Sequence, residues 1–214
     1  MRAYVSAVAI LGLSLAPHSS RGQKPFEGII TYDVYTGREP HSATVTAKGK
    51  RLRAEGWDEQ GRQGTTGTIL INAKGEFIMA TPERKVFMRP GGGELRLDSP
   101  THAWTFTKTG RNDAVLGSSC DYYTMHNTRS SKEQDTDLCI STTLGTIGVI
   151  PSRTFPGVEG LAQFPQGFVV LKTVDKNGKV LAVATKIDRH PVDEKLFEVE
   201  SDWREISLGA PGRP

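Results

Sequence analysis

Two cysteines, Cys120 and Cys139, are the residues of this 214-residue chain whose type and spacing most clearly indicate chemistry. In a hairpin whose turn is centred between Arg129 and Ser130, the two would lie directly opposite each other, at a separation that a disulfide can bridge. A metal site needs more ligands, and the histidines stand at no helpful spacing: they are His18, His41, His102, His126 and His190. We therefore expect a disulfide rather than a metal centre or a catalytic thiol.

Acidic residues near a histidine are the second candidate for chemistry. Asp135 and Asp137 share one face of an expected strand, close to His126 in the same hairpin. Such a cluster could do acid–base work, but a solvated rim of charged side chains is the favoured interpretation. The usual nucleophile, zinc-protease and phosphate-loop motifs are absent, and the run 91–93 of glycines lacks the lysine and helix start of a phosphate loop. No catalytic residue, metal or cofactor is predicted.

The first 22 residues have the pattern of a signal peptide. Arg2 is followed by an apolar run from about Val5 to Ala16, which is too short to span a bilayer. Small residues stand one and three positions before Gln23, which we expect to be the new N-terminus. This interpretation predicts a soluble protein of the periplasm or a secreted one. The alternative is an N-terminal membrane anchor that is never removed.

The charge of the chain argues against a nucleic-acid partner. The leader holds Arg2 and Arg21 and no acidic residue, so its removal leaves 25 Lys and Arg against 24 Asp and Glu. The basic residues are scattered and form no stripe with interleaved aromatic residues.

Residues 23–206 are enough for one domain that buries roughly 70% of its unfolded surface. We expect the tail, residues 207–214, to be disordered because it is rich in Gly and Pro.

The body of the chain consists of short β-type runs separated by turn residues, which predicts a mainly β fold made of an antiparallel sheet. The runs are Ile29–Tyr35, Ala43–Ala47, Arg51–Glu55, Thr68–Asn72, Glu76–Ala80, Val86–Arg89, Trp104–Lys108, Ala114–Leu116, Asp121–Asn127, Phe168–Val174 and Val180–Ile187. The last two are joined by Asp175-Lys176-Asn177-Gly178, whose Asn-Gly pair is a strong hairpin signal. Helix candidates are few: residues 142–149 and 193–198.

Several of these strands are apolar on both faces, as in Ile69-Leu70-Ile71 and Phe77-Ile78-Met79. Two arrangements satisfy this pattern: a sandwich that leaves some apolar residues exposed, or a strongly curved sheet around an apolar interior. A curved sheet would accept an acyl chain or another elongated apolar ligand, with the loop from Pro90 to His102 as a lid. The hypothetical cavity wall includes Ile69, Ile71, Phe77, Met79 and Met88.

Five segments carry a resemblance to a known family. They are Phe26–Tyr32, Lys48–Arg53, Ile71–Met88, Leu116–Tyr123 and Pro191–Val199. The first is similar to the family's opening strand, the second to its basic "K-G-d-r-h-R" segment, and the fourth to its "G-y-x-C-x-x-Y" strand. The chain thus resembles the domain of unknown function 4412 (DUF4412), which is secreted or periplasmic in bacteria.

The resemblance implies the fold of the lipoprotein carriers LolA and LolB. That fold is a curved, unclosed antiparallel barrel with a few short helices in its mouth and an apolar cavity for acyl chains. By the same resemblance, Arg53 would point into the barrel and bond loop carbonyls, while the plain alternative is an exposed strand arginine. Two departures stand out: Cys139 replaces a frequent tryptophan, and helical segments that could fill the mouth are hard to find.

Three classes of function remain open. A carrier or binding module for a lipid or acyl ligand is favoured by the doubly apolar strands and by the resemblance. A structural or protein-interaction domain of the cell envelope is the alternative, and it is favoured by the lack of site residues. An enzyme comes third, since it would require a convergent cluster of titratable residues in a cleft.

Overall fold

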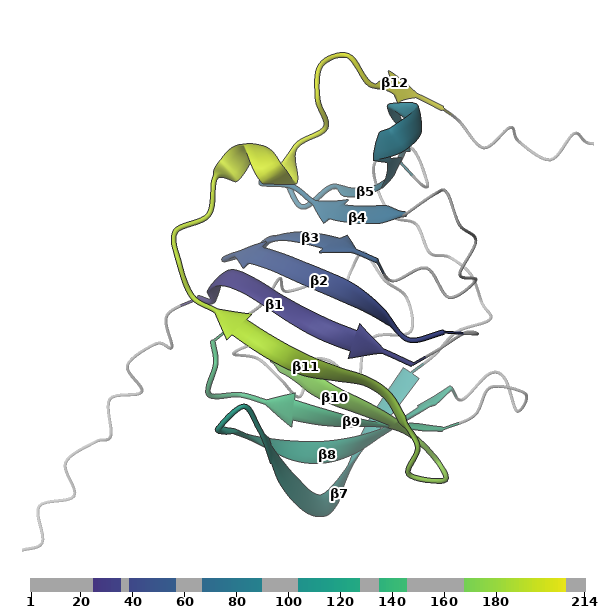
Figure 1. The fold of residues 1–214 in the computed structure, drawn as a ribbon, viewed down its shortest axis with the longest axis vertical. Helices are drawn as coiled ribbons and strands as arrows, with labels where there is room; N and C mark the ends of the chain where they lie inside the picture. The colour runs from purple at the N-terminus through teal and green to yellow at the C-terminus, as the bar shows by residue number, and fades with distance from the viewer. Residues whose placement is uncertain are drawn as a thin grey trace, which may run out of the picture.

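The structure, a computed structural model, describes residues 25–35, 39–56, 67–89, 104–127, 135–145 and 168–206. In these residues the chain forms twelve strands and two short 3-10 helices (Figure 1). The first six strands are β1 Glu27–Val34, β2 His41–Lys48, β3 Arg51–Glu55, β4 Thr68–Ile71, β5 Phe77–Thr81 and β6 Val86–Met88. The others are β7 Trp104–Val115, β8 Ser118–Asn127, β9 Thr136–Ser141, β10 Val169–Asp175, β11 Val180–Asp188 and β12 Arg204–Glu205. The helices are η1 Pro82–Arg84 and η3 Glu194–Phe197.

All twelve strands belong to one sheet, in the order β12-β6-β5-β4-β3-β2-β1-β11-β10-β9-β8-β7. Every neighbouring pair is antiparallel except β12 and β6, which are parallel. The two end strands, β12 and β7, do not pair with each other, so the sheet is not closed (Figure 1). The mainly β fold class and the unclosed antiparallel sheet are thus confirmed.

One face of the sheet carries the main core, and we call it the inner face. Side chains alternate along β1 because strand side chains point to opposite faces in turn, and Ile30, Tyr32 and Val34 are the buried set. The Tyr32 hydroxyl donates to the carbonyl of Val170 at 2.9 Å, although β11 lies between β1 and β10 in the sheet. The sheet therefore curls toward this face.

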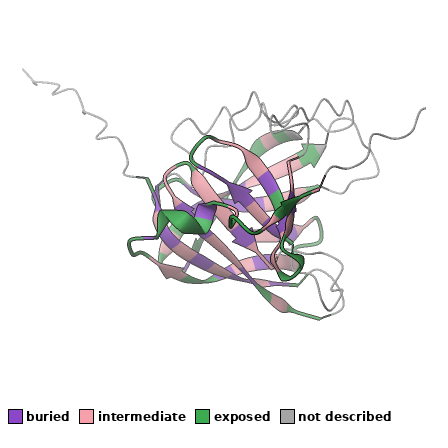
Figure 2. Ribbon diagram, turned by 90° about the horizontal axis from the view of Figure 1, so that it is seen from above, coloured by how far each residue is buried: buried purple, intermediate pink, exposed green. Residues whose placement is uncertain are grey.

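The opposite, outer face is apolar at both ends of the sheet. On β4–β6 it buries Leu70, Ile78 and Phe87, against which Val199 and Trp203 pack. On β9 it buries Leu138 and Ile140, packed with Phe106, Tyr123, Met125, Phe168 and Val170. The strands are apolar on both faces because each face holds a hydrophobic cluster. Figure 2 colours each residue of the ribbon by its burial, and buried and half-buried residues follow one another along the strands.

After β11 the chain runs past the ends of the neighbouring strands to β12 as a strap, residues 189–206 (Figure 1), and its Val199 and Trp203 pack on the outer face. Its first half is anchored by the buried side chains of Val192 and Phe197, which are 5% and 0% exposed. The Asp193 side chain accepts a hydrogen bond from the Lys195 amide and so caps η3. The predicted helix at residues 193–198 is confirmed as this single 3-10 turn. Beyond it, β12 pairs with β6.

The predicted hairpin of β10 and β11 is confirmed, and Asp175 explains its turn. The Asp175 carboxylate accepts hydrogen bonds from the amides of Asn177 at 2.8 Å and Lys179 at 2.9 Å. Gly178 has φ +81°, a left-handed conformation that costs a glycine little. The turn chemistry expected from the Asn-Gly pair is therefore present.

Two expectations about elements are wrong. The helix expected at residues 142–149 is absent from the part of it that the structure describes, since residues 142–144 form bends and residue 145 has no regular structure. The runs 104–108 and 114–116 are not separate strands, because β7 continues through an irregularity between Lys108 and Asn112. The expected leader at 1–22, the lid at 90–102 and the tail at 207–214 lie outside the described residues.

Candidate functional site

The five residues predicted to line a cavity share one face of the sheet. Ile69 lies opposite Met79, Ile71 opposite Phe77, and Met79 opposite Met88. Through β3 and β2 this face continues into the face of β1 that carries the core, so it belongs to the inner face. We call these five residues the inner apolar face of β4–β6.

This surface is only partly covered. Met79 is 43% exposed, Ile71 is buried, and the remaining three residues are half-buried. By contrast Leu70 and Ile78, the outward-pointing neighbours on the same strands, are 1% and 0% exposed. A ligand that binds this face would cover these accessible apolar side chains, which lie beside a filled core. A cavity at this place stays a prediction.

Arg53 lies on the outer face, because its neighbour Ala54 occupies the inner one. Its Nη1 donates to the carbonyl of Leu196 in η3 at 3.2 Å, and its Nη2 pairs with Glu55 at 2.7 Å. The side chain is 21% exposed. Arg53 therefore bonds a backbone carbonyl, as the resemblance implies, but it fixes the strap on the outside rather than a loop in the interior.

Cys120 and Cys139 form a disulfide with 5.2 Å between their Cα atoms, and both are buried in the main core. The expected direct opposition is wrong: Cys139 lies opposite Tyr122, and Asp121 opposite Ile140. The register differs from the expected one by two residues. Such a shift keeps each side chain on its face, so the two cysteines still meet, diagonally across neighbouring strands.

A charged network beside the disulfide was missed by sequence reasoning. The Asp113 carboxylate accepts hydrogen bonds from Lys172 at 3.0 Å and Tyr122 at 3.1 Å. The Lys172 ammonium and then the Ala114 amide hold the pKa of Asp113 below its usual range, while the Asp113 carboxylate raises the pKa of Lys172. The signal in the sequence was Lys172 itself, a charge inside the apolar run of β10.

The network continues along the same strands. The Arg111 guanidinium lies 4.4 Å from the centre of the Tyr122 ring and pairs with Asp137, which also accepts from Thr124. Burial raises the pKa of the Tyr122 hydroxyl. Each acid of this network faces a basic partner, so its charges are balanced within the protein.

The expected acid–histidine cluster is an exposed pair. His126 Nδ1 lies 2.5 Å from Asp135, and the two side chains are 49% and 48% exposed. Asp137 belongs to the network of Arg111 instead. The exposure of His126 and Asp135 matches the favoured interpretation, a solvated rim of charged side chains. Among the described residues, no three His, Cys, Asp or Glu side chains come together as metal ligands.

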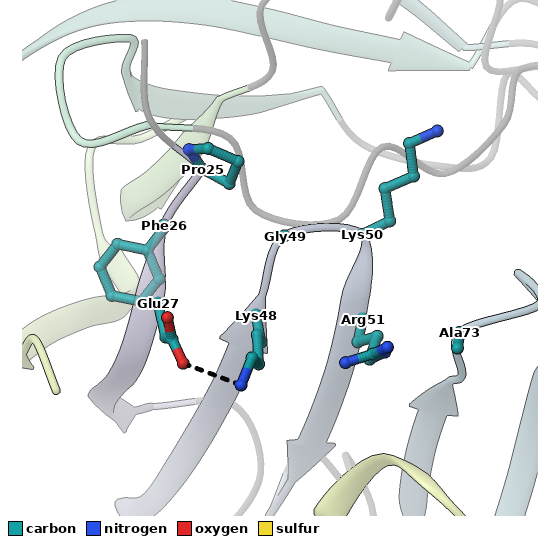
Figure 3. A pocket seen from close by; sticks show the side chains of 8 residues that line it. All are labelled: Pro25, Phe26, Glu27, Lys48, Gly49, Lys50, Arg51 and Ala73. Carbon is teal, nitrogen blue, oxygen red and sulfur yellow. Dashed lines mark ion pairs between the residues drawn. The ribbon is translucent and has the colours of Figure 1, made fainter. Parts of the chain in front are cut away.

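An open pocket of about 530 Å³ lies at one end of β1–β4, where the turn between β2 and β3 approaches the chain just before β1 (Figure 3). Its lining residues are Pro25, Phe26, Glu27, Lys48, Gly49, Lys50, Arg51 and Ala73. The Glu27 carboxylate pairs with Lys48 at 3.2 Å, the contact drawn dashed in Figure 3, and it accepts from the Val192 amide. The Val192 bond, more than Lys48, lowers the pKa of Glu27.

The cations of this pocket also hold the strap. Glu194 of η3 lies 2.9 Å from Arg51 and 3.5 Å from Lys48, and chiefly the bond to Arg51 lowers its pKa. Lys48 additionally donates to the carbonyl of Val192 at 3.0 Å. The pocket is therefore a polar junction between the sheet and the strap, separate from the inner apolar face.

No helix within the described residues is long and apolar enough to cross a membrane. The solved structures to which this chain is similar share little sequence with it. MucB in complex with MucA(peri) is 12% identical with a TM-score of 0.42, and covers 87% of this chain and 58% of its own. PNGF-II is 15% identical with a TM-score of 0.43, over 83% of this chain and 30% of its own.

MucB alone gives 12% identity and a TM-score of 0.41, over 86% of this chain and 60% of its own. The chain thus spans 60% or less of the length of each of these proteins. None of the curated proteins matches it. The model of one family does match, over residues 26–151, more than half of the chain. The protein therefore belongs to the family described as "Domain of unknown function (DUF4412)".

Proposed function

We propose that this protein is an exported, non-catalytic module that binds a lipid or another ligand with an acyl chain on the inner apolar face of β4–β6. The observation that carries the proposal is the contrast between the two faces of these strands. The outer side chains are buried under the strap, whereas Met79 on the inner side is 43% exposed within a row of apolar neighbours.

The energetics of burial support a ligand of this class. Each 100 Å² of apolar surface removed from water contributes roughly 2.5 kcal/mol. A few methylene groups lying along Ile69, Phe77 and Met88 would therefore give measurable affinity, since the curved sheet is held in shape without the ligand. A preformed apolar surface also avoids the cost of ordering the protein on binding.

A titration with a fluorescent fatty acid probe tests this function. We expect saturable binding to the wild-type protein and at least tenfold weaker binding to Met79→Asp. Leu196→Asp is the matched control, because Leu196 is equally accessible at 41% exposed but lies on the outer strap. The control should bind like the wild type. Absence of saturable binding, or equal loss in both variants, would favour a structural or protein-interaction domain of the envelope.

Export is a separate part of the proposal. The disulfide in the core supports an oxidising compartment, because disulfides are rare in cytosolic proteins. We expect the protein isolated from its envelope fraction to begin at Gln23 or within a few residues of it. Terminal sequencing checks this, and an intact Met1 on the exported protein would contradict it.

A further inference from the structure

The second half of the strap, residues 199–206, occupies the open edge of the sheet at β6. The Arg204 amide donates to the Lys85 carbonyl at 2.8 Å, and the Ile206 amide to the Phe87 carbonyl at 2.8 Å. These bonds align β12 in parallel with β6. An edge strand of this kind presents unpaired backbone groups to any extended segment that reaches it.

The side chains of this segment match the surface beneath them. Trp203 packs with Val199 on the outer cluster of Leu70, Ile78 and Phe87. Asp202 pairs with Lys85, and Glu205 pairs with Arg89, both at 2.6 Å. The Arg89 guanidinium lies 4.7 Å from the centre of the Phe87 ring, so the cation is part of the same surface.

This half of the strap is held far less firmly than the first half. Its strand is two residues long, and the side chains of the Lys85–Asp202 pair are 62% and 53% exposed. Exposed ion pairs contribute little to stability. Upstream, Val192 and Phe197 are buried and Arg53 bonds the Leu196 carbonyl. Segments with few buried contacts open at low free-energy cost while the rest stays folded.

We propose that residues 199–206 are a displaceable occupant of a peptide-binding edge. When they detach, β6 accepts an extended peptide of the same chemistry: an aromatic residue with acidic residues on both sides, added in parallel to β6. The backbone of β6 supplies the affinity, the cluster beneath Trp203 takes the aromatic ring, and Lys85 and Arg89 select the acidic side chains. This edge is distinct from the inner apolar face, and the proposal does not depend on a lipid ligand.

The test uses the full chain and a labelled peptide with the sequence of residues 199–206. In the wild-type protein the tethered segment competes at an effective concentration on the order of millimolar, so the peptide should bind weakly. Asp202→Asn/Glu205→Gln loosens the segment and leaves Lys85 and Arg89 intact. We expect the peptide to bind this variant roughly three- to tenfold more tightly than the wild type, because the competing segment has lost two exposed ion pairs. A peptide carrying the same two amide replacements is the matched control and should lose that gain.

Two further measurements keep the test independent of folding defects. Trp203→Ala loosens the same segment by a different contact and should also gain affinity for the unmodified peptide. Hydrogen exchange on the wild-type protein should show the amides of Arg204 and Ile206 exchanging at least 100-fold faster than those of β1. Equal exchange rates, or no saturable peptide binding to either loosened variant, would overturn the proposal.

Discussion

At the scale of single residues, the disulfide and the ion pair of Asp113 are the contacts with clear energetic consequences. We predict that Cys120→Ser lowers the melting temperature without changing the fold. The cysteines are 19 residues apart, and closing a loop of that size stabilises the folded state by roughly 3 kcal/mol. Thermal unfolding followed by circular dichroism measures the change.

The matched control is the wild-type protein under reducing conditions, which should melt close to the variant. Thiol labelling of the folded, unreduced protein should find no free cysteine, since both are oxidised and buried. Quantitative labelling would show that the disulfide is absent from the native protein.

Asp113 predicts a pH dependence of stability. Its pKa is lower in the folded protein than the ordinary 3.8, chiefly because of Lys172. A lowered folded-state pKa stabilises the protein above the unfolded pKa, and this contribution is lost as the pH falls through the folded value. Asp113→Asn should therefore destabilise the protein at pH 7, by about 1 kcal/mol or less for a partly exposed pair. Urea unfolding should show this difference shrinking as the pH falls below the ordinary pKa of 3.8 and toward the lower pKa of the folded protein. A difference that is constant with pH would contradict the assignment.

Sequence reasoning at this scale identified residue pairs but not their surroundings. The disulfide follows from two cysteines near one turn, whereas the network of Asp113 and Tyr122 is completed by Lys172, which is 59 residues from Asp113 in sequence. The face of Arg53 stayed open between the barrel interior and an exposed strand position, because the motif names the residue while the alternation of β3 decides which face it takes.

At the scale of elements, a glycine allows β1 and the end of β11 to approach closely. Gly28 has φ +145°, and a Cβ built there would clash with the Asp188 carbonyl and lie 2.9 Å from the Arg189 Cα. We predict that Gly28→Ala costs more than about 2 kcal/mol, because both the conformation and the space exclude a side chain. Chemical denaturation measures the loss.

Gly75→Ala is the matched control for that substitution. Gly75 also has a positive φ, +78°, but no atom lies within 4 Å of the Cβ position. Only the left-handed conformation is strained there, so the cost should be about 1 kcal/mol. Similar losses for the two variants would mean that the close approach of β11 does not matter.

Local patterns predicted the strands well and their pairing less well. The hairpin of β10 and β11 has a two-residue signal in Asn177-Gly178 and was placed correctly. The pairing of β8 and β9 depends on a polar connection without such a signal, and the expected register was wrong by two residues. β12 could not be predicted, because two residues of an otherwise irregular segment become a strand only through β6.

At the scale of the whole molecule, the structure explains why several strands are apolar on both faces. The sequence alone left this open between a sandwich and a curved sheet. The outer clusters are not a second sheet of a sandwich, since all described strands belong to one sheet. On β4–β6 the covering element is the strap, a single chain segment without regular structure along most of its length. The apolar pattern therefore reflects a hydrophobic cluster on each face of the sheet, and on β4–β6 the outer cluster is buried while the inner face is only partly covered.

The strap must then contribute to the stability of the whole sheet, and Phe197 is where this can be measured. Phe197 is 0% exposed, so Phe197→Ala should destabilise the protein by roughly 3–5 kcal/mol through the lost contacts and the cavity left behind. Leu196→Ala is the matched control at the neighbouring position: Leu196 is 41% exposed, and its loss should stay within about 0.5 kcal/mol. Urea unfolding of both variants gives the two values in one experiment. If Phe197→Ala is as mild as its control, the first half of the strap rests on the sheet without stabilising it.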